Sequence, residues 1–226
     1  MKLLLFCIVI SSCLTAHAQD LSGAFKTKTK DTNHLWLFKD GYGSHIVFKD
    51  NEYIGTKGGP FLFEDKVLVI KTEYNDRFPD SVGTTIEIPA ELNGQFLVLN
   101  DVKYEKSPHK LQDLDGVWRI TGRQSEDKMN PIPRSDRKTI KILVDGFFQW
   151  IAINPTVKGF YGSGGGRYDF EGTDYTEHID FFSRDNSRVG SQLKFKGLLK
   201  QEDWHHSGNS SKGQPIYEIW SKEKSL

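Results

Sequence analysis

Apolar and polar residues alternate with a period of two along much of this chain. Ile140, Ile142 and Val144 alternate with other residues, and Ile86 and Ile88 show the same alternation earlier in the chain. Successive side chains of a strand point to opposite faces, whereas a helix repeats its apolar positions every three or four residues. No segment after the N-terminal stretch gives a convincing amphipathic helix. The pattern therefore predicts an all-β protein.

Turn signals such as Asp40-Gly41, Asn93-Gly94 and Asp145-Gly146 separate the runs at short spacing. Counting runs between turns gives about eight strands in each half of the chain. In the second half we expect strands to start at residues 116, 138, 147, 166, 174, 190, 201 and 215. Such strands form either a sandwich or a closed barrel, and only closure removes the exposed edges. We therefore expect eight-stranded antiparallel meander barrels.

The chain also matches itself. Residues 20–25 (DLSGAF) correspond to residues 113–118 (DLDGVW), and the DG pair at 40–41 corresponds to the DG pair at 145–146. A further match joins 58–63 to 165–170, so the offset rises from 93 to 105 and then to 107. Ordered matches of this kind favour a duplicated domain over a chance likeness between Gly-rich turns.

The duplication predicts two tandem domains, residues 19–107 and 113–224. The Pro-containing stretch Ser107–Gln112 is the expected linker. The early rise in offset places an insertion before Asp145, and Glu126–Arg137 carries Pro131 and Pro133. This insertion is either a lid over a ligand cavity or a tolerated surface insertion.

Residues 1–18 have the pattern of a secretory signal peptide, with an apolar stretch from Leu3 to Ile10 and small residues at Ala16 and Ala18. We expect cleavage after Ala18 and a secreted or periplasmic protein. The alternative is a lipid anchor at Cys13, since the ISSC segment resembles a lipobox. The only other cysteine is Cys7, so cleavage after Ala18 excludes disulfides and cysteine-ligated zinc.

Charge, hydropathy and missing motifs argue against several further classes of function. The chain has 30 basic and 30 acidic residues, which gives no strong field for nucleic acid or an anionic membrane. After the signal peptide, charged residues interrupt every apolar run, so no transmembrane helix is expected. The glycines at 162–166 lack the GK[ST] of a phosphate loop and are expected to permit a bulge or corner. His205-His206 lacks a zinc motif and is interpreted as a solvated pair, so no metal or cofactor is predicted.

A set of motifs in the second half carries a family resemblance: GVWRI, DGFFQWI, GSGGGRYDF, DYTEHIDFF, WHHSG and YEIW. Over about residues 113–222 this set resembles secreted bacterial lipocalin-like domains of uncharacterised function, and Gly116-Val117-Trp118 looks like the Gly-x-Trp signature of lipocalins and calycins. The resemblance implies a barrel with a binding cavity. The first half departs from the pattern, because Phe25 replaces Trp118 and nothing matches YTEH or WHH. We therefore expect the first domain to be degenerate or structural.

An interior that holds a ligand needs aromatic walls with a few polar groups. The candidate ligand-binding residues in the second domain are Trp150, Tyr168, Tyr175, Glu177, His206 and Glu218. The alternative is that these aromatics are core residues whose polar atoms bond to the backbone. Adjacent strand residues face opposite sides, so only one of Glu177 and His178 can point inward. A buried Glu177 would have either a raised pKa, as in a general acid, or an ion pair with Arg119 or Arg167.

The sequence thus favours a secreted protein that binds a small apolar, amphipathic or glycan ligand in the second domain. One alternative is an enzyme acting on carbohydrate or lipid with Glu177 or His206 as acid/base. Another is an envelope protein whose first domain docks on an exported partner.

Overall fold

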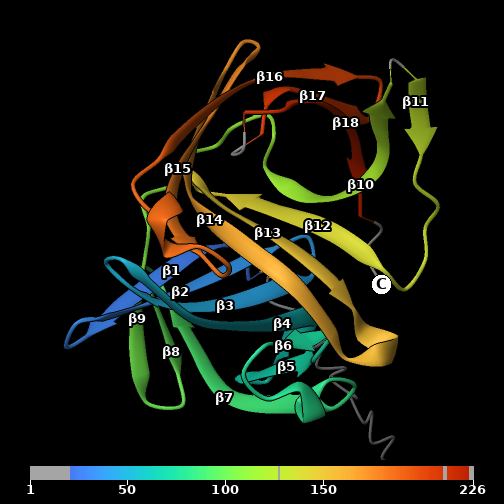
Figure 1. Cartoon of the computed structure of the whole chain (residues 1–226). Helices are drawn as coiled ribbons and strands as arrows, with labels where there is room; N and C mark the ends of the chain where they lie inside the picture. Colours follow the sequence, from blue (N-terminus) through green and yellow to red (C-terminus); the bar gives the residue numbers. More distant parts are fainter. Residues whose placement is uncertain (1–20, 127, 211–212, 224–226) are drawn as a thin grey trace, which may run out of the picture.

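The computed structural model describes residues 21–126, 128–210 and 213–223. These residues form two closed eight-stranded antiparallel β-barrels in succession, as the sequence predicted (Figure 1). The expected signal peptide, with Cys7, Cys13 and the cleavage point after Ala18, lies outside the described residues. Over the described part of the chain, no helix is long and apolar enough to cross a bilayer.

The strands of the first barrel are β1 (Gly23–Thr29), β2 (Thr32–Lys39), β3 (Tyr42–Lys49), β4 (Glu52–Glu64), β5 (Val67–Lys71), β7 (Thr85–Asn93), β8 (Phe96–Leu99) and β9 (Val102–Lys106). A two-residue strand, β6 (Tyr74–Asn75), pairs with β4, and η1 (Pro79–Ser81) follows it. Each barrel strand pairs with the next one in sequence, and β9 pairs with β1 to close the meander.

The strands of the second barrel are β10 (Gly116–Ser125), β12 (Lys138–Val144), β13 (Phe147–Asn154), β14 (Gly159–Glu171), β15 (Asp174–Phe182), β16 (Gln192–Lys200), β17 (Asp203–Asn209) and β18 (Pro215–Lys222). Pairing of β18 with β10 closes this meander. Short 3-10 turns, η2 (Pro155–Val157) and η3 (Asn186–Arg188), connect β13 to β14 and β15 to β16. The expected starts are met for five strands and missed by two residues for β16 and β17.

The start of β14 is the clear error, since the strand begins at Gly159 rather than at residue 166. The glycine-rich segment lies inside β14, where it pairs with β13 on one side and β15 on the other. A Cβ on Gly165 would lie 2.3 Å from Phe148 O, and a Cβ on Gly166 would lie 2.1 Å from His178 O. The pairing with β15 also shifts register between these two glycines. The expectation of a bulge is therefore confirmed.

The first barrel makes the same close approach at the repeated glycines. A Cβ on Gly58 would lie 2.2 Å from Gly43 O, and a Cβ on Gly59 would lie 2.0 Å from Lys71 O. Only glycine lets two backbones approach so closely. The repeated glycine pair thus has a structural cause.

The apolar residues gather in three clusters, one inside each barrel and one between them. Phe25, Trp36 and Phe38 belong to the interior of the first barrel, and Trp118, Tyr175 and Trp204 belong to that of the second. The residues of the third cluster come from both halves, and its buried members are Ala24, Leu35, Leu37, Tyr42, Ile46, Tyr74, Val117, Ile140, Ile142, Val144, Ile151, Ile153 and Phe181. The two barrels therefore share one hydrophobic interface.

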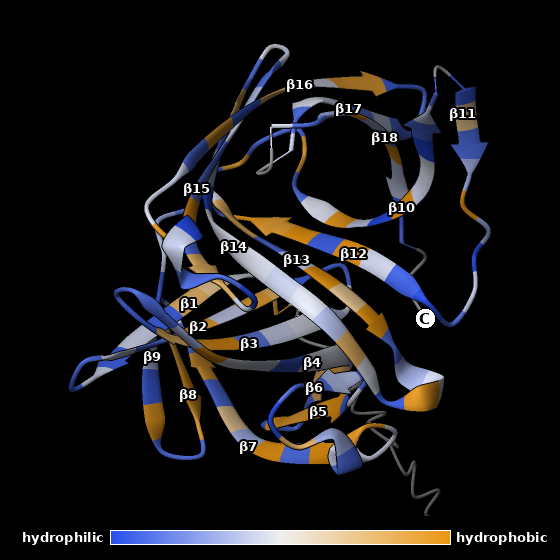
Figure 2. Cartoon of the chain, viewed as in Figure 1, coloured by the Kyte–Doolittle hydropathy of each residue, from blue (hydrophilic) through white to orange (hydrophobic). Residues whose placement is uncertain are grey.

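Figure 2 shows apolar residues along much of β12 and β13. The interface explains why both faces of β12 are partly apolar, with Ile142 between the barrels and Leu143 in the interior of the second. Figure 1 shows these strands crossing the first barrel. The Ile140–Ile142–Val144 row packs between the barrels, and the alternate residue Lys141 points into the second barrel. The alternating apolar row thus marks the contact with the other barrel and not the lumen.

Reciprocal contacts relate the barrels by an approximate twofold rotation. Asp40 Oδ2 accepts a hydrogen bond from Val117 N at 3.2 Å, and Asp145 Oδ2 accepts one from Ala24 N at 3.1 Å. Asp40 and Asp145 are equivalent in the repeat, as are Ala24 and Val117. Each β-turn therefore binds the first strand of the other barrel.

A buried polar group lies at the centre of this rotation. Ser44 and Gln149 are equivalent positions, and Ser44 Oγ donates to Gln149 Oε1 at 2.5 Å. Gln149 Nε2 donates to Thr56 Oγ1 at 3.0 Å and to Ser163 Oγ at 2.9 Å, which are again an equivalent pair. Because buried polar atoms are costly without partners, this network fixes the docking of the barrels.

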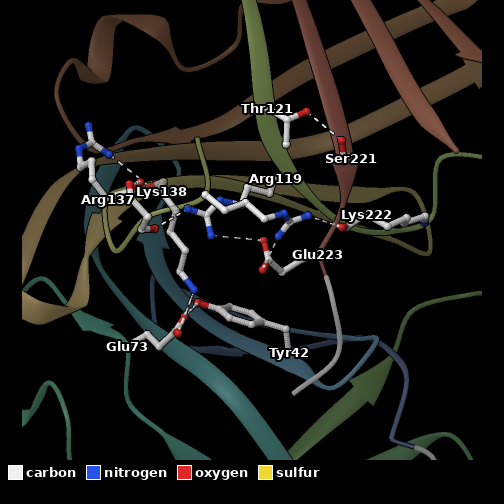
Figure 3. Close-up of polar contacts among 11 residues, drawn as sticks. Tyr42, Glu73, Arg119, Thr121, Arg137, Lys138, Ser221, Lys222 and Glu223 are labelled. Carbon is white, nitrogen blue, oxygen red and sulfur yellow. Dashed lines mark hydrogen bonds and ion pairs between the residues drawn. The ribbon is translucent and has the colours of Figure 1, made fainter. Parts of the chain in front are cut away.

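Ion pairs and hydrogen bonds of charged side chains lie along one edge of the interface (Figure 3). Lys138 Nζ of the second barrel lies 2.7 Å from Glu73 of the first, and the Tyr42 hydroxyl donates to the same carboxylate at 2.8 Å. Arg119 lies 4.0 Å from Glu223 and donates to Ser135 O. Arg119 therefore belongs to the outer wall of the second barrel.

Candidate functional site

The second barrel contains a cavity of about 530 Å³, which lies within the range of small-molecule sites. Its lining residues are Arg123, Arg137, Thr139, Lys141, Trp150, Ala152, Tyr161, Glu177, Ile179, Phe182, Arg184, Leu193, Phe195, Ser210, Ile216, Glu218 and Trp220. The lining runs from exposed residues such as Tyr161 to buried ones such as Trp220. The cavity therefore has a solvent-facing mouth and a buried floor.

The equivalent interior of the first barrel is filled by stacked rings. Trp36 takes the place of Lys141, and His45 takes the place of Trp150. The Trp36 and His45 rings stack at 4.5 Å, and a hollow of about 170 Å³ borders His45. One aromatic in place of a lysine thus accounts for much of the difference between the barrels.

Lys141 and Glu177 form a buried ion pair at the floor. Lys141 Nζ donates to Glu177 Oε1 at 2.8 Å, and both side chains are about 95% buried, with exposures of 5% and 6%. The ammonium also lies 5.0 Å from the Trp204 ring, 5.1 Å from Trp220 and 5.3 Å from Tyr175. Partner and rings together offset the cost of burying a charge.

Tyr175 supports the same carboxylate. Its hydroxyl donates to Glu177 Oε1 at 2.8 Å. Burial first, and then the charge of Glu177, raise the pKa of Tyr175 well above its ordinary value. Tyr175 is therefore a permanent hydrogen-bond donor to Glu177.

Glu218 forms a second buried polar group. Arg123 lies 2.7 Å from Oε1, while Oε2 accepts from Trp220 Nε1 at 3.1 Å and lies 3.4 Å from His206 Nδ1. Burial alone raises the pKa of Glu218, but the hydrogen bond from His206 and the nearby positive charges outweigh it and lower the pKa to about 2. Glu218 is therefore an ionised carboxylate with both oxygens engaged.

His206 stays neutral in this setting. Burial lowers its pKa below the ordinary 6.5, in spite of the opposing effect of Glu218. Its ring packs on Tyr175, Phe195 and Trp204. The buried Nε2 makes no hydrogen bond within the described residues, so His206 is a core histidine behind the cavity wall.

The mouth of the cavity is cationic. Arg137 and Arg184 are both exposed lining residues, and the Arg137 guanidinium lies 3.9 Å from the centre of the Tyr161 ring. Among the described residues, neither arginine has a carboxylate partner within ion-pair distance. The carboxylates of the lining, in contrast, are already paired inside.

The structure divides the six candidate residues into two groups. Trp150, Glu177 and Glu218 line the cavity. Tyr168, Tyr175 and His206 lie in the packed core behind the lining, where the Tyr168 hydroxyl donates to Asp115.

Two details of the sequence interpretation were wrong. Glu177 pairs with Lys141 and not with the expected Arg119 or Arg167. Arg119 contacts Glu223, and Arg167 contacts Asp180. The histidine pair is not solvated, since one member, His206, is buried in the barrel core.

The predicted alternation of side chains along the strands is confirmed. Glu177 faces inward, whereas His178 points away and lies 3.3 Å from Asp169. Likewise His205 contacts Tyr217 on the outside of the barrel. Over the described residues, no three His, Cys, Asp or Glu side chains gather closely enough to hold a metal ion.

Sequence reasoning missed the cations of the lining, above all Lys141, Arg137 and Arg184. Lys141 stands between two isoleucines and had the pattern of a solvent-facing residue. The available signal was the repeat, which aligns Lys141 with Trp36, a large core aromatic.

The insertion is partly built into the site. Its strand β11 (Lys128–Pro131) pairs with the end of β10, and Ile132 packs against the core of the second barrel. Of the residues of the insertion that the structure describes, only Arg137 lines the cavity. The insertion thus extends the barrel wall and supplies one cation at the mouth.

Comparison with known proteins found no matching family model and no matching curated protein. The site is therefore interpreted from its own geometry.

Proposed function

We propose that the second barrel binds a small amphipathic molecule inside its cavity. The observation that carries the proposal is the contrast between the two halves of one repeat. The second barrel encloses about 530 Å³, whereas stacked rings occupy the matching positions of the first. Close-packed interiors are the rule in proteins, so a hollow of this size in one copy indicates a purpose other than stability.

The lining supports an amphipathic ligand. Trp150, Ile179 and Phe182 offer apolar contact area, while charged groups occupy the floor and the mouth. The resemblance to lipocalin-like domains agrees with this proposal, as does the expected export signal ahead of the described residues. In this proposal the protein works outside the cytoplasm, with the first barrel as a rigid support.

Blocking the cavity tests the proposal. N-phenylnaphthylamine is a neutral probe whose fluorescence rises in apolar surroundings, and we expect it to bind the intact protein. Ala152→Phe places a ring in the cavity and is expected to weaken binding about tenfold or more. The matched control, Thr176→Phe, adds the same ring on the outer face of β15 and should bind like the wild type.

Native mass spectrometry of the purified protein gives an independent measurement, because a retained ligand appears as added mass. Equal probe binding by Ala152→Phe and the wild type, with both folded, would show that the cavity is not the binding site.

A further inference from the structure

The floor of the cavity presents a hydrogen-bond donor and an acceptor side by side. Glu177 uses Oε1 for both Lys141 and Tyr175, and its Oε2 makes no hydrogen bond among the described residues. This side chain is more than nine-tenths buried and lines the cavity. Lys141 Nζ makes one hydrogen bond to a side chain among the described residues, and the rings of Trp204 and Trp220 lie 5.0 Å and 5.1 Å from it. Its other N–H groups are therefore free to donate to a ligand.

A hydroxyl group fits this pair better than a charged group does. It donates to Glu177 Oε2 and accepts from Lys141 Nζ, and so satisfies both partners at once. A ligand carboxylate at the floor would meet the charges of Glu177 and Glu218, and a ligand ammonium would meet that of Lys141. Like charges at close range in a buried site are strongly unfavourable.

The charges at the mouth, unlike those at the floor, favour a charged group on the ligand. The lining contains four cationic side chains, Arg123, Arg137, Lys141 and Arg184, and two carboxylates, Glu177 and Glu218. Both carboxylates have cationic partners in Lys141 and Arg123. The excess positive charge therefore belongs to Arg137 and Arg184, which favour an acidic group at the entrance.

We propose that the ligand is an organic acid with a hydroxyl group at the end remote from its carboxylate. The acid lies at the mouth beside Arg137 and Arg184, the apolar body contacts Trp150 and Phe182, and the hydroxyl reaches Glu177 and Lys141. This inference rests on the proposed binding function and adds the chemical class and the direction of entry.

Four competitors of one chain length test the proposal on the intact protein: ω-hydroxydodecanoate, dodecanoate, dodecanol and dodecylamine. Each displaces N-phenylnaphthylamine, and the displacement gives its affinity. In an apolar cavity an added hydroxyl weakens binding, because it is buried without a partner. Here we expect ω-hydroxydodecanoate to bind about tenfold more tightly than dodecanoate, as a hydrogen bond to a charged group provides.

The acid should bind about fivefold more tightly than the alcohol, the amine should bind weakest, and added salt should reduce the preference for the acid. Arg137→Gln combined with Arg184→Gln should remove that preference. The control removes two exposed cations elsewhere, Lys194→Gln with Lys200→Gln, and should retain it.

The double variant Lys141→Met, Glu177→Leu removes the floor pair at similar volume. It should lose the hydroxyl preference and keep the acid preference, with folding checked by circular dichroism. If the neutral probe binds but the hydroxyl weakens binding, or acid and alcohol compete equally, this inference is wrong and the binding function stands. If the neutral probe and all four competitors fail to bind, the proposed function itself is wrong.

Discussion

His45 is half-buried and His206 is buried, and aromatic rings pack against both side chains. Burial is the main cause that lowers the pKa of His45 to about 3, with help from the charge of Lys57. Burial likewise lowers the pKa of His206. Both side chains are therefore neutral in the folded protein at a pH where the unfolded chain already binds protons.

This difference predicts a loss of stability in mild acid. Below about pH 6.5 the unfolded state takes up protons that the folded state does not, so the free energy of unfolding falls as the pH falls. Each of these two histidines contributes up to about 1.4 kcal/mol per pH unit. Urea unfolding between about pH 7 and about pH 5 measures the slope. His45→Gln should flatten it, whereas His205→Gln, on the outer face of the second barrel, should not.

The ion pair at the cavity floor gives a second prediction. Lys141→Met leaves Glu177 as a buried charge without its cation and should lower the free energy of unfolding by about 3–5 kcal/mol. Adding Glu177→Leu should restore most of the loss, because no unpaired charge remains. Equilibrium urea unfolding of the single and double variants checks both values. A single variant as stable as the wild type would contradict the pairing.

At the scale of elements, the alternation of residues predicted the strands but not their inner side. On β12 the apolar residues Ile140 and Ile142 face the other barrel, and Lys141 faces the lumen. A strand buried on both faces has no single wet side, so polarity alone does not indicate which face is the interior. The candidate residues Tyr168, Tyr175 and His206 do face the interior, but they lie where rings pack it closely and so do not line the cavity.

The glycine pairs give a prediction at the same scale. Gly165→Ala places a Cβ 2.3 Å from Phe148 O, which forces β13 and β14 apart. We expect a loss of about 3 kcal/mol or more, or no folding. Gly172→Ala is the control, since this turn glycine meets nothing within 4 Å and its positive φ costs only about 1 kcal/mol. Thermal unfolding of the two variants compares them directly.

At the scale of the whole molecule, the repeat in the sequence predicted two barrels, but nothing in it predicted their interface. Matches such as Asp40-Gly41 with Asp145-Gly146 identified equivalent turns. That each turn binds the first strand of the other barrel depends on three-dimensional docking, which a single sequence does not specify.

The shared interface predicts that the barrels are not independent. Fragments 21–110 and 111–226, expressed separately, should each expose the apolar cluster between the barrels and unfold without cooperativity. Mixed, they should form a one-to-one complex with the cooperative unfolding of the intact chain. Sedimentation and calorimetry of each fragment and of the mixture provide the test. Two fragments that remain monomeric and fully stable when separate would contradict it.

The near-symmetry of the two halves has a consequence for how they can specialise. In a homodimer of identical subunits, every replacement is made on both sides of the axis. A residue that packs the interior and makes it rigid therefore removes the space for a ligand from both subunits at once. A polypeptide that contains both partners escapes that constraint. Trp36 stiffens one half with stacked rings, while Lys141, at the matching point, leaves the other half hollow.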